Sequence, residues 1–391
     1  MNILSISSIL PIPGIITTND FVFQTYIHYK QLFKDDSIAI IKPVKLDLRP
    51  NLVLKKTTRL GRLNRLFTRN INGFQVEVFP FYSSWGFRNL HAIITRTVYY
   101  LNAGRIRSLF SQYNFDIIHA QYIFPDAMLA YMLHRKYKIP YVITTHNERF
   151  YFEHCISKSM AIRILKSASG IFPINHFNYS FYKSIGISNI ELIPLGFSDS
   201  FIKVQKLSSK EVIHILTVAE LIKLKNIDKV IYAISELVRK HPMIIYTVIG
   251  QGPEKESLLN LVESLGIANH VVFIEKIPYE YIADEMYKHD IFIMPSYFET
   301  FGRVYFEAMA MGIPIICAKN SGIYGIFKEM EEGISVDHNN ISDIVNALEF
   351  LITNPERRHR IGFNGKKLVE QYTWTNIAER LHTKYIEMIH S

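Results

Sequence analysis

Two glutamates eight residues apart are the side chains of this sequence that most strongly suggest ligand chemistry. Glu299 and Glu307 occur in PSYFETFGRVYFEAMAMG, which passes from an aliphatic run into a helical pattern. Glu299 lies beside Gly302, whose missing side chain lets a ligand approach the backbone. An isolated pair of glutamates is more often solvated surface. The apolar residues around Glu307 favour instead a carboxylate that is held in a core and turned toward a ligand.

A lysine and a glycine turn could hold a phosphate group. Lys225 follows the aliphatic run 212–218 and precedes a helical pattern, where its charge suits a diphosphate, although an exposed lysine at a helix start is the common alternative. Gly250 and Gly252 follow the run 243–249, so amides there could face a phosphate, and a plain turn explains them equally well. Position 255 is Lys, and no G-x-x-x-x-G-K-[ST] occurs, so the dinucleotide and triphosphatase fingerprints both fail.

Two histidines stand at the ends of neighbouring strand candidates. His119 belongs to the run 116–120 and His146 follows the run 141–145, so both would face the crevice beyond the strand ends. A lone histidine is more often structural than catalytic. Because two histidines stand at neighbouring strand ends, a structural and a catalytic role are about equally expected here. The remaining histidines and the two separate cysteines show no metal-site spacing, and no Asp-x-Asp occurs. We therefore expect no metal, and unpaired cysteines indicate a reducing, cytoplasmic setting.

The elements that would position these residues alternate between strands and helices. Short aliphatic runs occur at 2–7, 37–41, 116–120, 141–145, 170–174, 191–194, 212–218, 243–249, 271–274, 291–294 and 313–317. Amphipathic segments such as 226–240 separate most of them, which predicts βαβ units and parallel sheets. The length of 391 residues favours two domains. A polar stretch without a clear period, 198–210, is the expected linker.

The charge is divided unevenly along the chain. The net charge is +9, with 23 Lys and Arg against 11 Asp and Glu in residues 1–200, and 21 against 24 in residues 201–391. Segment 42–69 carries nine Lys and Arg and one acid. Arg59, Arg62, Arg65 and Arg69 recur at helical spacing beside an apolar side, which predicts a basic amphipathic helix. No run reaches the roughly 18 apolar residues of a membrane span, and the apolar start has no basic n-region to mark a signal peptide.

Together these motifs resemble the retaining GT-B glycosyltransferases of the family 4 type, also called glycosyl transferases group 1. Glu299 and Glu307 match the family's E-x7-E signature, and TVAELIKLKN, TVIGQGP, IELIPLGFSDSF, DIIHAQY and TTHNERF follow in the family's arrangement. The resemblance implies an α/β GT-B fold of two doubly wound Rossmann-like domains facing a cleft. It implies an acceptor-side domain at 1–200, a nucleotide-sugar domain at 201–372 and a terminal helix at 373–391 that packs back on the first domain.

The resemblance also implies roles for single residues. Glu307 would accept hydrogen bonds from the nucleotide ribose. Glu299 and the amides of Thr300, Phe301 and Gly302 would hold the donor sugar and diphosphate, with Lys225 neutralising the leaving group and Gly14 and Gly250 approaching the donor. His146 would lie near the anomeric centre, with His119 as an acceptor-side neighbour. Glu299, Lys225 and His146 are thus the expected catalytic residues.

The expected function is metal-independent, retaining hexosyl transfer from a nucleoside-diphosphate sugar to a glycan or lipid-linked acceptor, in cell-surface polysaccharide or glycolipid synthesis. No cofactor and no nucleic-acid partner are expected. The basic first half would dock on an anionic membrane, at the inner face of the cytoplasmic membrane. One departure from the family is Glu220, where an arginine is usual five residues before the lysine; Lys223 could replace its charge. The alternatives are a silent GT-B protein that binds a nucleotide sugar or a partner, and a sugar phosphorylase. The base, sugar, acceptor and oligomeric state stay open.

Overall fold

The computed structural model describes residues 1–11, 20–47, 68–83, 91–146, 152, 158–202, 211–320 and 322–390. They form two units, each with its own sheet. Unit 1 consists of Met1–Ile174, Asn178–Pro194 and Trp374–Ser391, and unit 2 consists of Asn175–Phe177 and Leu195–Thr373. No helix in the described ranges has both the length and the apolarity that crossing a membrane requires.

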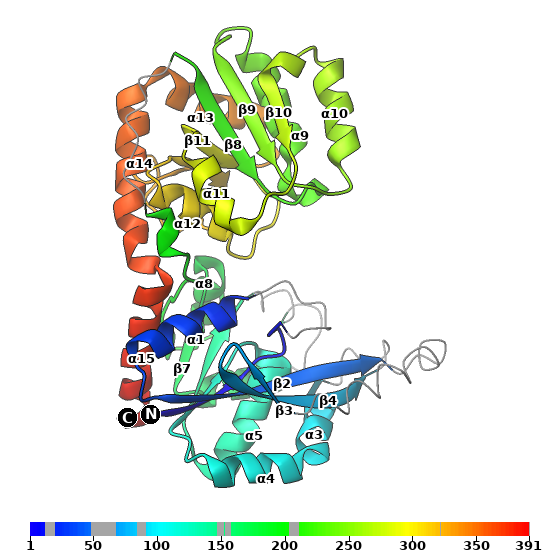
Figure 1. Cartoon of the computed structure of the whole chain (residues 1–391), viewed down its shortest axis with the longest axis vertical. Coiled ribbons are helices and arrows are strands. Elements are labelled where there is room, and N and C mark those ends of the chain that lie inside the picture. Colours follow the sequence, from blue (N-terminus) through cyan, green and yellow to red (C-terminus); the bar gives the residue numbers. More distant parts are fainter. Residues whose placement is uncertain are drawn as a thin grey trace. The chain divides into compact units, whose positions relative to one another are not determined.

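Unit 1 is built on a seven-stranded sheet in the order β3-β4-β2-β1-β5-β6-β7 (Figure 1). All neighbouring strands are parallel except β3 and β4, which form an antiparallel pair. The strands are β1 (Asn2–Ile6), β2 (Ser37–Asp47), β3 (Thr68–Ile71), β4 (Phe74–Ser83), β5 (Ile117–Ala120), β6 (Tyr141–Thr145) and β7 (Gly170–Pro173). The short strands β5, β6 and β7 are buried along their whole length, as expected for parallel strands covered on both faces.

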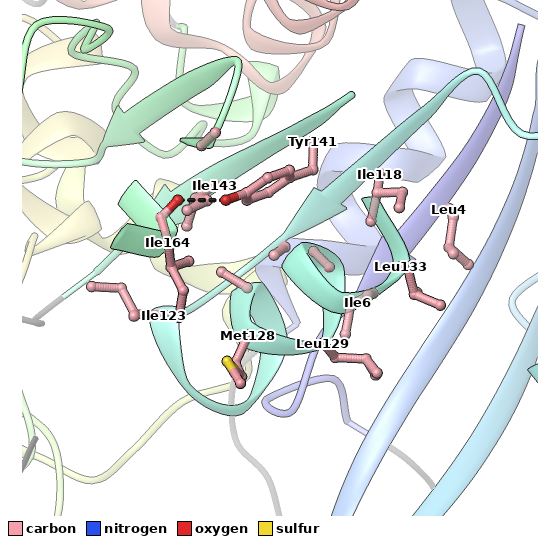
Figure 2. Packing of buried hydrophobic residues seen from close by; sticks show 14 of the residues in the cluster. Leu4, Ile6, Ile118, Ile123, Met128, Leu129, Leu133, Tyr141, Ile143 and Ile164 are labelled. Carbon is pink, nitrogen blue, oxygen red and sulfur yellow. Dashed lines mark hydrogen bonds between the residues drawn. The ribbon is translucent and has the colours of Figure 1, made fainter. Parts of the chain in front are cut away.

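Helices of unit 1 supply the apolar faces that cover this sheet. They are α1 (Phe21–Leu32), α3 (His91–Leu101), α4 (Ala103–Gln112), the π-helical turn η2 (Ile123–Ala127), α5 (Met128–Tyr137), α7 (Lys158–Ser167), α8 (His176–Ser184) and α15 (Trp374–His390). Figure 2 shows how Met128, Leu129 and Leu133 of α5 pack against Ile6 and Ile118 of the central strands. The Tyr141 hydroxyl donates a hydrogen bond to the Ile164 carbonyl, so the phenol is satisfied inside this core.

Unit 2 contains a six-stranded, all-parallel sheet in the order β10-β9-β8-β11-β12-β13. The strands are β8 (Ile213–Val218), β9 (Ile244–Ile249), β10 (Val271–Ile274), β11 (Ile291–Met294), β12 (Ile315–Ala318) and β13 (Ile334–Val336). The helices are α9 (Ile227–Leu237), α10 (Lys255–Ser264), α11 (Tyr279–Met286), α12 (Arg303–Ala310), α13 (Ile341–Thr353) and α14 (Pro355–Val369), with short helical turns η3 (Asp199–Phe201), η4 (Lys223–Lys225), η5 (Ala268–His270) and η6 (Glu370–Tyr372). The order reverses beside β8, the kind of position where open sheets bind ligands.

Some expected elements differ in the structure. The run 191–194 is not a strand: it lies along β7, with hydrogen bonds from Glu191 N to Ile171 O (2.9 Å) and from Ile193 N to Pro173 O (3.0 Å). The β3–β4 hairpin and β13 were not predicted, and β2 is longer than expected. The division between the units falls after Pro194 rather than after residue 200. The stretch beyond it bonds within unit 2, where Phe197 N donates to Tyr372 O at 3.2 Å.

The predicted basic helix is wrong at its end. Arg69 lies in strand β3, opposite Val76 of β4, because Asn72 and Gly73 both adopt positive φ and form a tight hairpin turn. Arg59, Arg62 and Arg65 lie outside the described residues, as do Gly14 and most of the expected linker.

Candidate active site

Lys225 and Glu299 meet in unit 2, although 74 residues separate them. Lys225 ends the turn η4 after β8, and Glu299 lies in the loop between β11 and α12. The ammonium Nζ is 2.5 Å from the carboxylate Oε2, and each side chain is 17% exposed. A partly buried ion pair of this kind holds both charges in place, and removing one partner leaves the other uncompensated. The structure therefore places a fixed cation beside a fixed carboxylate at the carboxyl ends of two neighbouring strands.

Two glycines shape the loop around Glu299. Gly302 has φ +76° and Gly322 has φ +59°, and a Cβ at either position would lie 3.0 to 3.1 Å from the Glu299 Cγ. The Gly322 amide donates to the Glu299 carbonyl at 2.9 Å. Gly302 also faces the ring of Tyr305, which a Cβ would approach to 2.6 Å. Side chains at these positions would be strained and would displace the carboxylate.

Helix α12 starts directly after this loop, and the first amides of a helix have no carbonyl partner within it. Gly302 precedes the first helical residue, Arg303. The Phe301 side chain is buried and stacks on Phe306 with ring centroids 4.6 Å apart, so only its backbone can reach a ligand. The Thr300 carbonyl accepts a hydrogen bond from Asn175 Nδ2 at 2.7 Å. The backbone of 300–302 is thus held firmly at a helix N-terminus, which favours an anion such as a phosphate.

Glu307 lies on α12 and is 4% exposed. Its Oε1 accepts a hydrogen bond of 2.8 Å from the hydroxyl of Tyr279, the first residue of α11. Tyr279 itself is 45% exposed, and its ring lies 5.6 Å from Phe201 and 6.0 Å from the Arg303 guanidinium. Sequence reasoning missed Tyr279, because no local pattern links a tyrosine at a helix start to a glutamate 28 residues later. A buried carboxylate is thereby presented beside an exposed phenol.

The glycine pair after β9 serves close packing of the backbone. A Cβ on Gly250 would lie 1.8 Å from Ala219 O, and one on Gly252 would lie 2.4 Å from Leu221 O. The Gly250 amide donates to Ile274 O at 3.0 Å, so that amide is used within the protein. The glycines let the loop after β9 lie against the loop that leads to Lys225. Glu220, at the start of that loop, is exposed. A contact of Gly250 with a donor stays a prediction.

His119 is a buried residue of β5 and not a residue beyond the strand end. Its Nε2 hydrogen-bonds Thr144 Oγ1 at 2.8 Å, and its Nδ1 lies 2.5 Å from the Tyr385 hydroxyl and 3.2 Å from that of Tyr26. Burial lowers the pKa of His119 to about 3, so the ring is neutral at pH 7. Both ring nitrogens tie β5 to α1, β6 and α15. These contacts give His119 a packing role inside unit 1.

His146 follows β6 directly, as predicted, and is 2% exposed. Its ring contacts those of Phe21 (centroids 4.8 Å apart) and Tyr122 (4.7 Å), and Nε2 is 3.4 Å from Gln121 Oε1. The Asn178 amide donates to its carbonyl at 2.8 Å. Burial, with a smaller effect of His119, lowers the pKa of His146 to about 3. The ring is therefore a neutral hydrogen-bonding group, held by two aromatic rings, and not a proton donor near pH 7.

A buried lysine and aspartate were also missed by sequence reasoning. The Lys42 ammonium donates to Ser8 O at 2.7 Å, and the Asp126 carboxylate accepts from Ser8 N at 2.9 Å. Burial raises the pKa of Asp126 to about 7 and lowers that of Lys42 to about 8. Together they anchor the chain where it leaves β1 toward the segment that contains Gly14. Within the described ranges, no group of three His, Cys, Asp or Glu side chains could hold a metal ion.

Two family models match adjoining parts of this chain. The model described as Glycosyltransferase Family 4 matches residues 65–201, and the model described as glycosyl transferases group 1 matches residues 198–368. The second match contains Lys225, Gly250 and the whole segment from Glu299 to Glu307. The first contains His119 and His146.

Curated relatives and solved structures agree with these models. An uncharacterized glycosyltransferase of Methanocaldococcus jannaschii is 24% identical over 300 residues, which are 74% of this chain and 81% of that protein. A GDP-mannose-dependent phosphatidylinositol monomannoside mannosyltransferase of Mycolicibacterium smegmatis is 29% identical over 43% of this chain, which spans about half (46%) of that relative. The fold is shared with Anabaena HepE in complex with UDP, with a TM-score of 0.71 and 16% identity over 99% of both chains. This chain therefore belongs to the group 1, family 4 glycosyltransferases and has their GT-B fold.

Proposed function

We propose that this protein transfers a hexosyl or related unit from a nucleoside-diphosphate sugar to a glycan or lipid-linked acceptor, with retention of configuration. The observation that carries the proposal is the 2.5 Å pair of Lys225 and Glu299 beside the N-terminus of α12. A departing diphosphate requires positive charge and aligned amides, and this arrangement offers both. The reaction then needs no divalent metal.

Each candidate site residue of unit 2 has a proposed role. Lys225 neutralises the leaving diphosphate, and Glu299 exchanges its contact with Lys225 for hydroxyls of the donor sugar. The amides near Thr300, Phe301 and Gly302 bind the diphosphate. Glu307 accepts hydrogen bonds from the ribose, because a buried carboxylate with one oxygen already bonded has a defined direction for further donors.

In unit 1, we propose that His146 lies near the anomeric centre and hydrogen-bonds the reacting sugar. Gly14, which lies outside the described residues, is proposed to approach the diphosphate. His119 supports the strand next to β6 and needs no contact with substrate.

The acceptor and setting are also proposals. The named relative from Mycolicibacterium smegmatis acts on a phosphatidylinositol mannoside, which supports a lipid-linked acceptor here. The charge excess of the first half supports docking at the anionic inner face of the cytoplasmic membrane, and so a role in polysaccharide or glycolipid synthesis. Anabaena HepE binds UDP and the mycobacterial relative uses GDP-mannose, so both bases are the first to test.

The mechanism is tested by determining the anomer formed in the presence of EDTA. A panel of UDP, GDP, ADP and their sugars first identifies the donor, because a ligand at 100 times its Kd stabilises the folded state by about 2.7 kcal/mol. We expect NMR of the product to show the donor's anomeric configuration, with an unchanged rate in EDTA. An inverted product, or a rate abolished by EDTA and restored by Mg²⁺, would contradict the mechanism. A nucleotide that binds without transfer would favour the silent GT-B alternative.

Tyr279→Phe is expected to raise the donor KM about tenfold and to leave kcat nearly unchanged. The substitution removes the hydroxyl that orients Glu307 and keeps the ring, and one hydrogen bond to a charged group contributes about 1.5 kcal/mol. Glu307→Ala should raise the donor KM further, since it removes the ribose contact itself. Steady-state kinetics with varied donor measures both. Tyr281→Phe, on the same helix and 59% exposed, is the matched control and should behave like the wild type.

A further inference from the structure

One corner of unit 1 combines exposed positive charge with a complete lack of acids. Helices α3, α4 and α5 and the residues just after α5, taken as 91–112 and 128–140, contain no Asp or Glu. Five cations on them are exposed: Arg96, Arg107, Arg135, Lys136 and Lys138. None of the five forms an ion pair with a carboxylate of the described residues, whereas Arg105, on the inner side of α4, pairs with Glu77. We call this surface the α3–α5 corner.

The same corner carries large apolar side chains in solvent. Tyr100 is 69% exposed and Leu101 is 64% exposed, and no other large hydrophobic residue of the described ranges is more exposed than these two. They sit at the end of α3, where Asn102 separates it from α4. Tyr100 and Leu101 do not contribute to the core of unit 1, whereas α4 buries its apolar side through Ile106 and Leu109. Exposed apolar side chains next to each other suggest a binding surface.

Contacts between the helices bring the charged and apolar parts together. The Lys136 ammonium, at the end of α5, lies 5.7 Å from the ring centroid of Tyr99, which precedes Tyr100. Phe110 of α4 stacks on Tyr137 of α5 with centroids 3.9 Å apart. Figure 1 shows α3, α4 and α5 grouped beside the strands of unit 1. The end of α3, the length of α4 and the end of α5 thus belong to one surface.

We infer that the α3–α5 corner docks on an anionic lipid bilayer, with Tyr100 and Leu101 entering the headgroup region and the five cations contacting lipid phosphates. Tyrosine and leucine beside Lys and Arg are the composition of interfacial membrane anchors. A nucleic acid would use the cations but would leave Leu101 without a partner, because single strands bind by stacking on aromatic rings. This docking surface rests on the membrane docking in the proposed function. It lies on helices α3, α4 and α5 and the residues just after α5, instead of on segment 59–69.

The test is co-sedimentation of the full chain with vesicles made of equal parts phosphatidylcholine and phosphatidylglycerol. Replacing Arg107, Arg135 and Lys136 by Gln should weaken binding about 100-fold, since each cation near an anionic surface contributes about fivefold. Tyr100→Ser with Leu101→Ser should weaken it about tenfold. Binding of the wild type should be lost in 1 M salt, where the Debye length falls from about 10 Å to about 3 Å.

Matched variants keep the result interpretable. Arg239, Arg357 and Arg360 are exposed cations of unit 2, and changing all three to Gln removes the same charge but should lower binding less than threefold. Every variant should keep the thermal midpoint and the nucleotide-induced shift of the wild type, so that a loss of vesicle binding is separated from misfolding and from failure of the donor site.

Several results would overturn the inference. Wild-type vesicle binding by the α3–α5 corner variants would overturn it. This holds if binding is instead lost on changing Arg59, Arg62, Arg65 and Arg69 to Gln, and also if neither set of substitutions affects binding. Equal binding to pure phosphatidylcholine vesicles would also overturn it. Tighter binding to an oligonucleotide than to anionic vesicles, lost in the same corner variants, would assign the surface to nucleic acid instead.

Discussion

Lys225→Met is expected to lower kcat/KM about a thousandfold. The substitution removes the cation proposed to stabilise the leaving diphosphate, and loss of one such preorganised group typically costs 10² to 10³ in rate. It also removes the cation 2.5 Å from the Glu299 carboxylate, so the negative charge of Glu299 beside the proposed phosphate position loses its contact with Lys225. The two effects act in the same direction. Steady-state kinetics with the donor found in the nucleotide panel measures the loss.

A second lysine–glutamate pair of unit 2 provides the control. Lys255 and Glu275 are 3.0 Å apart, but their side chains are 37% and 83% exposed, and exposed pairs contribute little. Lys255→Met should therefore change kcat/KM less than twofold. Equal losses in the two variants would mean that Lys225 has no special role, and full activity of Lys225→Met would remove the diphosphate assignment.

The double variant separates the lost cation from the exposed carboxylate. Lys225→Met with Glu299→Gln should bind the nucleoside diphosphate more tightly than Lys225→Met alone, because the repelling charge is gone, and more weakly than the wild type. If the loss of affinity in the double variant equals the sum of the losses in Lys225→Met and Glu299→Gln alone, the pair does not act as a unit. Isothermal titration with UDP or GDP gives these affinities without requiring turnover.

His146→Ala is expected to lower kcat about a hundredfold and to leave the donor KM nearly unchanged. The ring contacts Phe21 and Tyr122, and its proposed hydrogen bond to the reacting sugar would act in the transition state and not in nucleotide binding. Because burial lowers the pKa of His146 to about 3, the ring stays neutral between pH 5 and pH 8. The pH profile of the wild-type kcat should therefore show no ionisation of this histidine in that range. A raised KM with unchanged kcat would contradict the role.

His119→Gln is the matched control for a buried histidine without a proposed contact to substrate. Its replacement leaves Thr144, Tyr26 and Tyr385 with poorer partners, so we expect a loss of about 2 kcal/mol in the free energy of unfolding and an unchanged kcat. The folded pKa of about 3 lies below the unfolded value, so His119 stabilises the fold above about pH 6.5 and this contribution is lost as the pH falls. Between pH 4 and pH 6 the variant should lose stability less steeply, by about 1.4 kcal/mol per pH unit.

The sequence alone was sufficient for most strands of the two sheets and for the elements that carry the site. Predicted strands 141–145, 271–274 and 291–294 coincide with β6, β10 and β11, because each is a short continuous apolar run; β6 and β11 are also buried along their whole length, as parallel strands covered on both faces are. The placement of Glu299 in a loop and of Glu307 on the following helix was also predicted, since glycine and helix signals are local. The hydrophobic pattern gave the wrong secondary structure where strand pairing determined it. Arg69 fits a helical stripe, but the hairpin with β4 makes it part of a strand.

Only the tertiary structure decided which polar groups meet. The sequence placed His119 and His146 alike at neighbouring strand ends. In the structure the His119 ring bonds Tyr385, 266 positions away on α15, whereas the His146 ring contacts those of Phe21 and Tyr122. The bonds between Lys225 and Glu299 and between Tyr279 and Glu307 join residues 74 and 28 positions apart. Periodicity records which face of an element is buried, which is a local property. Hydrogen-bond partners depend on how several elements pack in three dimensions, and one sequence without the fold contains no local signal for that.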